Sequence, residues 1–449
     1  MLVRSSPARF TSSPWAAACC SALLILVALP IDAQYSVGAP STISARGEIP
    51  EREDLEDQWE EARWNLGALR VQPWIGIDQV GFVTDQDLEG LEVPDDAAEE
   101  RETTDFTATV GAGVRGYARL GRDVMLAAHV LPEYVWWREA DERSGLAGRY
   151  GAGLFGHWNR LHAGLSHRLE ERQGFYNSEV LVLTRLREQA SRGEVEIEVF
   201  RDLWLFGAVE ERSFEETGDV EEIFRALDRD ESVLEAGVRL LSRRGLSLAV
   251  GVREQETEFD DTARPLSNDE SALFLTGTLE GQRVDLAFHL TARELEATSG
   301  SLLGTIDETT GSLQVTFHAR ERADLFVLAD RTLDYSIDPL ASTFLEDRFG
   351  AGVSARFGRT RLQLFAAQGE VEVTGLTTGG VARDDEFTEV AADFQVELRR
   401  LATVGVNASW RDYESEDSRF TRDVARVGLT IRLGEILDRL RLGESSSRW

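Results

Sequence analysis

The side chains that could do chemistry in this sequence are charged residues that alternate with apolar ones. Successive side chains of a β-strand point to opposite faces, so each such run has one apolar face and one charged face. All 48 basic residues are arginine, because the chain contains no lysine. On the charged faces we expect Arg115, Arg149, Arg239, Arg253, Asp285, Arg293, Arg320, Arg356, Arg411 and Arg426.

These ten side chains would line the lumen if the strands close into a barrel. Rings of arginine inside a pore favour anions. The alternative is that the arginines pair with carboxylates on the same faces, such as Glu133 and Glu235, and so hydrate and stiffen the wall. The alternation alone does not separate these two interpretations.

Two histidines are the best candidates for a metal site. His157 and His162 share the charged face of one hairpin, on either side of a turn at residues 158–160, and paired imidazoles can bind a cation. The same hairpin offers no carboxylate at a matching offset. The sequence also lacks a nucleophile motif and a glycine-rich phosphate loop, so we predict no metal, no cofactor and no enzymatic activity.

The hairpin is the element that positions these residues, and residues 146–169 show it most clearly. Apolar residues alternate with glycine and charge on both sides of the turn. Similar turns recur at spacings of 37 to 43 residues, which fits two long strands, one tight turn and one longer connection. The turns centre near Gly121, Asn159, Arg201, Arg244, Gly281, Arg322, Arg359 and Arg400, and they predict about eighteen strands.

The alternating segments are long enough to cross a membrane. A tilted transmembrane strand needs roughly 9 to 11 residues, and the sheet must close because lipid cannot satisfy an unpaired edge. We predict an all-β fold, a closed antiparallel transmembrane β-barrel with short periplasmic turns and longer acidic extracellular loops. The acidic connections are Asp85–Glu102, Glu210–Glu222, Glu254–Asp261, Asp384–Glu386 and Glu414–Asp417.

Two stretches depart from the regular pattern. Residues 178–200 are too long for one strand of ordinary length, so they form either an extra hairpin or one strand that projects past the membrane; we favour the second. Between Leu362 and Val373 the alternation changes phase, which suggests a β-bulge near Ala366.

Residues 1–33 have the pattern of a secretory signal peptide, with cleavage expected between Ala33 and Gln34. Both cysteines, Cys19 and Cys20, lie inside this segment, so the mature chain is expected to form no disulfide. Export places the mature protein outside the cytoplasm.

The rest of the chain divides into three parts. Residues 34–67 are a polar periplasmic leader with a short helix, residues 68–433 the barrel, and residues 434–449 a C-terminal periplasmic tail. The net charge of −32 argues against nucleic acid as a partner.

The leader ending in EARWNLG (residues 61–67), the first strand with Pro73 and the arginine-turned hairpins together resemble the bacterial β-barrel porins grouped as "beta-barrel porin 2". The last strand, residues 426–433, is similar to the signal that the barrel assembly machinery reads, although it ends in Leu433 and not in an aromatic residue. The resemblance implies an outer-membrane porin.

Two functions are consistent with such a barrel. The first is a passive channel for small hydrophilic solutes in the bacterial outer membrane. The second is a non-conducting barrel, associated with polymer export or serving as a surface scaffold, whose lumen is closed by side chains or by the leader. The expected partners are outer-membrane lipid and the assembly machinery, and the sequence leaves the oligomeric state open.

Overall fold

A computed structural model describes most of residues 49–433. The residues outside the description are 1–48, 51, 87–101, 141–142, 176–178, 180–182, 218–221, 243–244, 262–264, 321, 339, 377–380, 400–401, 416, 418–419 and 434–449. Among the described residues, no helix is long and apolar enough to span a membrane.

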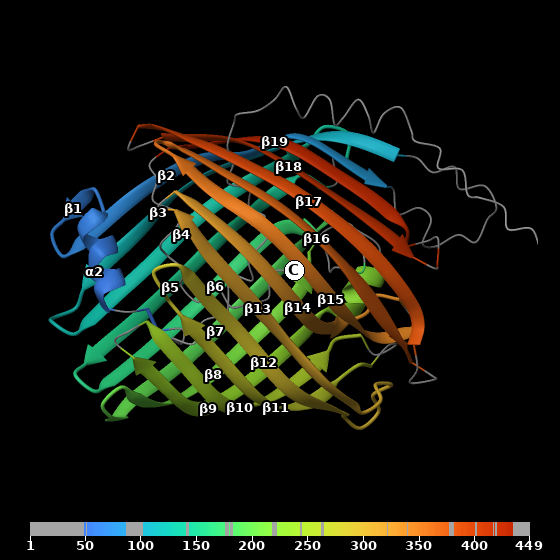
Figure 1. Ribbon diagram of the computed structural model, residues 1–449, viewed down its shortest axis with the longest axis horizontal. Helices are drawn as coiled ribbons and strands as arrows, with labels where there is room; N and C mark the ends of the chain where they lie inside the picture. Colours follow the sequence, from blue (N-terminus) through green and yellow to red (C-terminus); the bar gives the residue numbers. More distant parts are fainter. Residues whose placement is uncertain are drawn as a thin grey trace, which may run out of the picture.

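Eighteen long strands dominate the described part of the chain, and each runs antiparallel to the next (Figure 1). They are β2 (Leu69–Gln86), β3 (Glu102–Arg119), β4 (Val124–Trp137), β5 (Gly145–Trp158), β6 (Leu161–Phe175), β7 (Leu183–Phe200), β8 (Leu203–Glu216), β9 (Arg229–Ser242), β10 (Leu246–Phe259), β11 (Asn268–Leu279), β12 (Val284–Ala297), β13 (Ile306–Arg320), β14 (Ala323–Tyr335), β15 (Ala341–Phe357), β16 (Thr360–Gly375), β17 (Val381–Arg399), β18 (Ala402–Ser415) and β19 (Arg422–Leu433).

The sheet closes on itself, because β19 pairs with β2 from Leu433 opposite Ile75 to Arg426 opposite Val83. A three-residue strand, β1 (Trp64–Leu66), pairs only with the start of β2. Closure leaves no long edge strand exposed. The predicted fold class, a closed antiparallel barrel of about eighteen strands, is confirmed.

The predicted tight turns gather at one end of the barrel, which we call the short-turn end. Several of them need a left-handed residue, as two-residue hairpin turns do: φ is 85° at Gly121, 38° at Asn159, 66° at Asp202 and 78° at Gly245. The other connections lie at the opposite end, the long-loop end.

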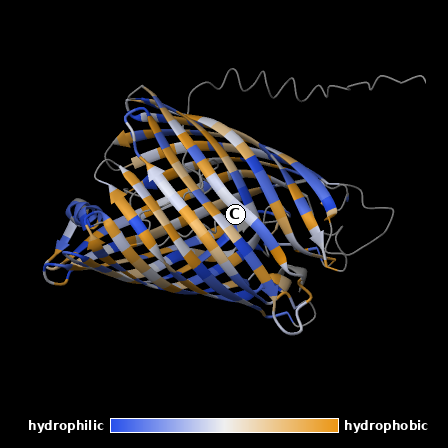
Figure 2. Cartoon of the chain, turned by 60° about the horizontal axis from the view of Figure 1, so that its bottom comes forward, coloured by the Kyte–Doolittle hydropathy of each residue, from blue (hydrophilic) through white to orange (hydrophobic). Residues whose placement is uncertain are grey.

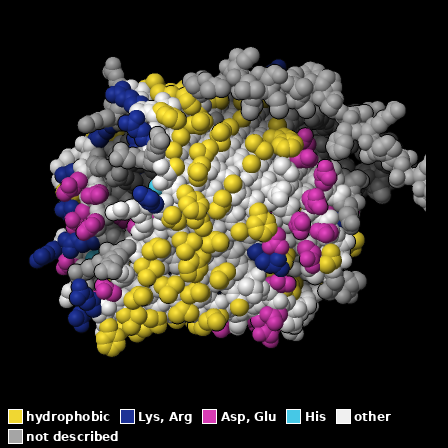
Figure 3. Space-filling view, viewed as in Figure 1, with side chains coloured by type: hydrophobic (Ala, Val, Ile, Leu, Met, Phe, Trp, Pro, Cys, Tyr) yellow, Lys and Arg dark blue, Asp and Glu magenta, His cyan; other side chains and the backbone are white. Residues whose placement is uncertain are grey.

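The outer face carries an apolar band. On β10, Leu246, Val250 and Val252 are exposed on the outside, whereas Ala249 points inward and is buried. Figure 2 shows the resulting alternation along each strand, and Figure 3 shows the band crossing the barrel, with acidic side chains beside it toward the long-loop end.

The acidic segments predicted as connections are largely strand, which corrects their boundaries. Glu210 lies inside β8, Glu254 inside β10 and Glu414 inside β18. The strands therefore continue past the apolar band, because water tolerates charged side chains on a strand that has left the hydrocarbon. Residues 87–101 of the first acidic connection lie outside the described part.

The structure shows the conformation of the two stretches that depart from the regular sequence pattern. Residues 183–200 form the single strand β7, as favoured from the sequence. The predicted bulge near Ala366 is wrong, since β16 pairs with β17 in unbroken register from Thr360 to Val373. A register shift does occur in β2 between Asp78 and Gly81, where Gln79 has a φ of 57°.

The leader includes one helix, α2 (Arg52–Glu61), which packs against the inner wall at the short-turn end. Its Leu55 is fully buried with Tyr117, Met125 and Phe155 of β3, β4 and β5. The signal peptide with its Ala33–Gln34 cleavage site, and the tail at 434–449, lie outside the described residues.

A second apolar cluster fills part of the barrel at the long-loop end. Leu227 of the short 3₁₀ helix η3 (Glu222–Leu227), Leu266 and Phe420 come from connections and pack on Val371 and Val373 of β16. These two valines point inward, and that reversal explains the change of phase in the sequence pattern.

Candidate functional site: the charged lumen

The predicted charged faces lie on the inside of the barrel. Arg115, Arg239 and Arg426 are buried in the inner wall. Each of four others lies within 3.4 Å of a carboxylate of a nearby strand: Arg149 with Glu133, Arg253 with Glu235, Arg293 with Glu270 and Arg356 with Glu397. Most of these arginines are thus ion-paired and not free.

The remaining candidates differ in their surroundings. Arg411 lies 4.1 Å from the ring centre of Phe387 and 4.0 Å from Glu346. Asp285 bonds to His318 at 2.8 Å, near the short-turn end. The Arg320 side chain lies outside the described part.

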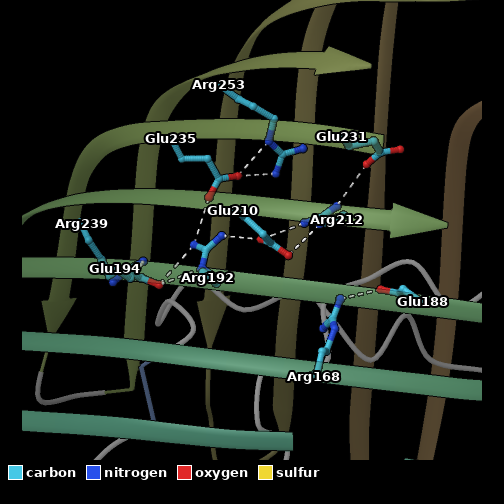
Figure 4. A network of polar contacts seen from close by, with 10 residues as sticks. All are labelled: Arg168, Glu188, Arg192, Glu194, Glu210, Arg212, Glu231, Glu235, Arg239 and Arg253. Atoms are coloured by element: carbon cyan, nitrogen blue, oxygen red, sulfur yellow. Dashed lines mark hydrogen bonds and ion pairs between the residues drawn. The ribbon is translucent and has the colours of Figure 1, made fainter. Parts of the chain in front are cut away.

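One arginine in the lumen wall, Arg192, was not among the residues predicted from the sequence. Arg192 of β7 binds Glu194 at 3.2 Å, Glu210 of β8 at 2.9 Å and Glu235 of β9 at 3.1 Å (Figure 4). Its neighbours in the chain are Ser191 and Gly193, so no apolar alternation marks it. The sequence does place Arg192 two residues before Glu194, and this spacing predicts that both side chains lie on the same face of the strand.

This ion-pair lattice extends to neighbouring strands, because side chains directly opposite or diagonal on paired strands are within reach of one another. Arg212 binds Glu210 at 2.7 Å and approaches Glu231 to 3.9 Å. Arg168 of β6 binds Glu188 of β7 at 2.6 Å. The lattice alternates in sign and does not form an arginine ring (Figure 4).

Aromatic rings inside the barrel fix several of these arginines. Phe206 lies against Gly237, where a Cβ would come within 2.6 Å of the ring, and Arg239 stacks over the same ring at 4.6 Å. Phe274 repeats this arrangement with Gly251 and Arg253, the latter at 5.9 Å. The glycines leave room for the ring, and the ring holds the guanidinium by cation–π attraction.

A sequence signal for this arrangement exists. In both cases glycine and arginine are separated by one valine, as Gly-Val-Arg at 237–239 and at 251–253. Residues two apart on a strand lie on the same face. The triplet therefore predicts an inward-pointing arginine next to a glycine that leaves room for an aromatic ring.

A cavity of about 300 Å³ opens inside the barrel toward the long-loop end. Arg212, Arg253 and Arg293 come from β8, β10 and β12. Asp330 and Glu346 come from β14 and β15. The side that carries the arginines also contributes Glu231 and Glu270, so charges of both signs line the cavity.

In the part of the chain that the structure describes, no group of three or more histidine, cysteine or carboxylate side chains is placed to hold a metal ion. The rings of His157 and His162 are 4.9 Å apart. Nε2 of His157 instead bonds to the carbonyl oxygen of Pro50 at 2.9 Å. This histidine therefore helps to hold the leader inside the barrel.

Two arginines of the inner wall hold the helix α2 at the short-turn end of the barrel. The guanidinium groups of Arg70 and Arg119 each lie 3.8 Å from the ring centre of Trp59. Arg70 also donates hydrogen bonds to the carbonyl oxygens of Trp59 and Glu60 at the end of the helix. Cations near a helix C-terminus are favourable, so this contact stabilises both the helix and its position.

No family model matches the chain, and no curated protein matches it. Among solved structures, OccK2 (OpdF) of Pseudomonas aeruginosa, solved in complex with glucuronate, is 12% identical; the match covers 81% of this chain and 98% of that one, with a TM-score of 0.49. A BenF-like porin from Pseudomonas fluorescens is 10% identical over 81% and 98% of the two chains, also with a TM-score of 0.49. A porin is thus among the structures that this chain resembles, and the eighteen-stranded barrel itself is established by the chain's own strand pairing.

Proposed function

We propose that this chain is an outer-membrane β-barrel that acts as a passive channel for small hydrophilic solutes. The observation that carries the proposal is the distribution of polarity. The barrel is apolar on the outside and charged on the inside, which is the opposite of the polarity of a soluble protein. This distribution suits a barrel that has lipid outside and water inside. The same observation supports the location in the bacterial outer membrane.

The proposed orientation puts the short-turn end in the periplasm and the long-loop end at the cell surface. Trp64 and Leu66 of β1 are exposed at the short-turn end, where an apolar anchor at the membrane interface is favourable. The leader helix α2 then sits in the periplasmic mouth.

The paired arginines favour weak ion selectivity. Arg192 is shared among three glutamates, and Arg253 is held by Glu235. A wall with balanced charges attracts water and dipolar solutes without excluding either sign of ion. We therefore expect a reversal potential close to zero in a salt gradient, and strong anion selectivity would instead support the free-arginine interpretation.

The closed-lumen alternative is favoured by one observation. The helix α2 and the apolar cluster of Leu227, Leu266 and Phe420, here called the Phe420 cluster, occupy opposite mouths of the barrel. Such a barrel would conduct only after both of them move, because the two obstructions lie one after the other along the lumen. The same barrel could then serve as an export conduit or a surface scaffold.

Single-channel recording of the refolded mature protein separates these functions. We expect discrete conductance steps, and larger steps in Leu55→Asp, which places a charge in the buried seat of α2. Asp57→Asn, on the exposed side of the same helix, is the matched control and should behave as wild type. Absence of conductance in all three proteins would reject the channel in favour of the closed barrel.

Two partners are proposed on the same basis. Outer-membrane lipid would contact the apolar band. The assembly machinery would read β19, which is the strand that closes the barrel onto β2. Replacing Leu433 with phenylalanine, the expected terminal aromatic, should leave assembly in cells unchanged or improve it, and reduced assembly would count against this role.

A further inference from the structure

The connection between β6 and β7 passes through Glu179, whose side chain is completely buried. Its carboxylate accepts three hydrogen bonds. Arg383 Nη2 donates at 2.6 Å, Ser336 Oγ at 2.9 Å and the backbone N–H of Ile337 at 2.9 Å. A guanidinium, a hydroxyl and a backbone N–H thus converge on one carboxylate.

These donors belong to the opposite side of the barrel. Arg383 is on β17, which lies seven strands from β6 around the closed sheet. Ser336 and Ile337 follow β14, which lies seven strands from β7 in the other direction. Since the barrel has eighteen strands, Glu179 reaches across the long-loop mouth to the far wall.

The receiving pocket is held in place by contacts other than Glu179. Arg383 Nε donates to Asp385 at 2.6 Å, and its Nη1 lies 3.3 Å from Asp338. The hydroxyl of Tyr413 also donates to Asp385, at 2.9 Å. Removal of the Glu179 carboxylate would therefore leave the guanidinium oriented toward an empty space.

The Arg383 guanidinium is further fixed by an aromatic ring, since it lies 3.7 Å from the ring centre of Phe420. It is 5% exposed, so few water molecules can replace a lost partner. Buried donors left without an acceptor are costly, and this creates a demand for an anion of carboxylate shape.

We propose that Arg383, Ser336 and the Ile337 N–H form a carboxylate-binding site that the chain occupies with its own Glu179. The site takes small monocarboxylates when Glu179 is removed or displaced, and occupation by Glu179 ties the β6–β7 connection across the mouth. The inference rests on side-chain geometry and holds whether or not the barrel conducts.

Acetate tests the site, because Glu179→Ala deletes the atoms that acetate contains beyond the Cβ. Thermal unfolding of the refolded full chain is followed in detergent while sodium acetate replaces sodium chloride at constant ionic strength. We expect E179A to melt several degrees below wild type in chloride and to recover with acetate, saturating at a concentration on the order of 10 mM. Wild type should not respond.

Three controls make the result specific. Glu256→Ala removes an exposed glutamate of the outer face and should not respond to acetate. The double variant E179A/R383Q should lose the response, and the neutral isostere acetamide should not replace acetate. An equal response in wild type, or no response in natively folded E179A, would overturn the proposal. If E179A does not refold in chloride, its refolding yield in acetate becomes the readout, and an equally poor yield in both salts also overturns it.

Discussion

Two parts of the inner wall share a construction and differ in what covers them. On β10 and β11, Phe274 lies against Gly251, and on β15 and β16, Phe365 lies against Gly350; in both, an arginine stacks over the ring. Toward the long-loop end the first wall continues with arginine and glutamate, facing the cavity. The second continues on β16 with the buried Val371 and Val373 beneath the Phe420 cluster, whereas Glu346 of β15 still lines the cavity.

The difference shows that strand alternation sets which side chains point inward but not what they meet there. An inward residue may face water in the lumen or a connection folded into the barrel. The first environment selects paired charges, and the second selects apolar side chains with one buried ion-pair cluster at Glu179. Substitutions on the two walls should therefore fail for different reasons.

The largest effect is expected from Arg192→Met, in the ion-pair lattice that joins β7, β8 and β9. The substitution leaves Glu194, Glu210 and Glu235 close together without their shared cation. Since these side chains are at most 10% exposed, breaking the buried pairs should cost about 3 to 5 kcal/mol. Urea unfolding in lipid vesicles measures the loss.

The control for this substitution is Arg201→Ala at the short-turn end. Arg201 is 73% exposed and 3.8 Å from Asp202, so its removal should cost no more than about 1 kcal/mol. Equal losses in the two variants would mean that the lattice contributes nothing beyond surface pairs.

The sequence allowed the barrel, the positions of its turns and the inward faces to be predicted, because all three follow from a period of two and from glycine-rich or polar turns. It did not reveal Arg192, whose neighbours are not apolar. Nor did it reveal that Val371 and Val373 point inward. Their environment comes from Leu227, Leu266 and other connection residues that are remote in the chain, and a local pattern carries no such information.

The next largest effect is expected from filling the space that a glycine leaves for a phenylalanine ring, a feature that both walls contain. Gly350→Ala and Gly251→Ala would each place a Cβ 2.6 Å from a phenylalanine ring, so both should destabilise the barrel, by about 1 to 3 kcal/mol. Gly251→Ala should cost more than Gly350→Ala, because its Cβ would also lie 2.6 Å from the backbone oxygen of Ala236, whereas the three atoms nearest to the Gly350 Cβ belong to side chains. Unfolding midpoints in urea provide the measurement.

Gly207→Ala is the matched control for the glycine seats. Gly207 also lies within a strand, but the nearest atom to its added Cβ would be 3.7 Å away, which is an ordinary contact. Its substitution should be close to neutral. If it costs as much as G350A, the loss reflects strand glycines in general and not the ring seat.

A smaller effect is expected at the leader helix from Trp59→Leu. The substitution removes the ring that lies between Arg70 and Arg119 but keeps an apolar side chain. Loss of the two cation–π contacts should weaken docking of α2 by about 1 to 2 kcal/mol. Trypsin cleavage within the helix at Arg52 should accelerate about tenfold. A cleavage rate equal to that of Asp57→Asn would show that the ring does not hold the helix.

The smallest effect concerns pH at the long-loop end, where Asp228 joins η3 to β9. Burial, with Glu216 and Asp260 nearby, raises the pKa of Asp228 to about 6. The folded state thus binds this proton more tightly than the unfolded chain, whose aspartate titrates near 3.9. The stabilisation is complete below about pH 4 and is lost as the pH rises through 6.

Asp228→Asn should remove this pH dependence, because asparagine keeps the oxygen that accepts the 2.7 Å hydrogen bond from the backbone N–H of Glu216 without carrying a charge. At pH 4 the variant and wild type should unfold alike. Above pH 6 the variant should be the more stable, by less than about 1 kcal/mol since water screens the site. Asp230→Asn, on the exposed outer face, should follow wild type at every pH. A D228N curve parallel to wild type would show that burial of this carboxylate beside the cavity does not make the stability of the barrel depend on pH.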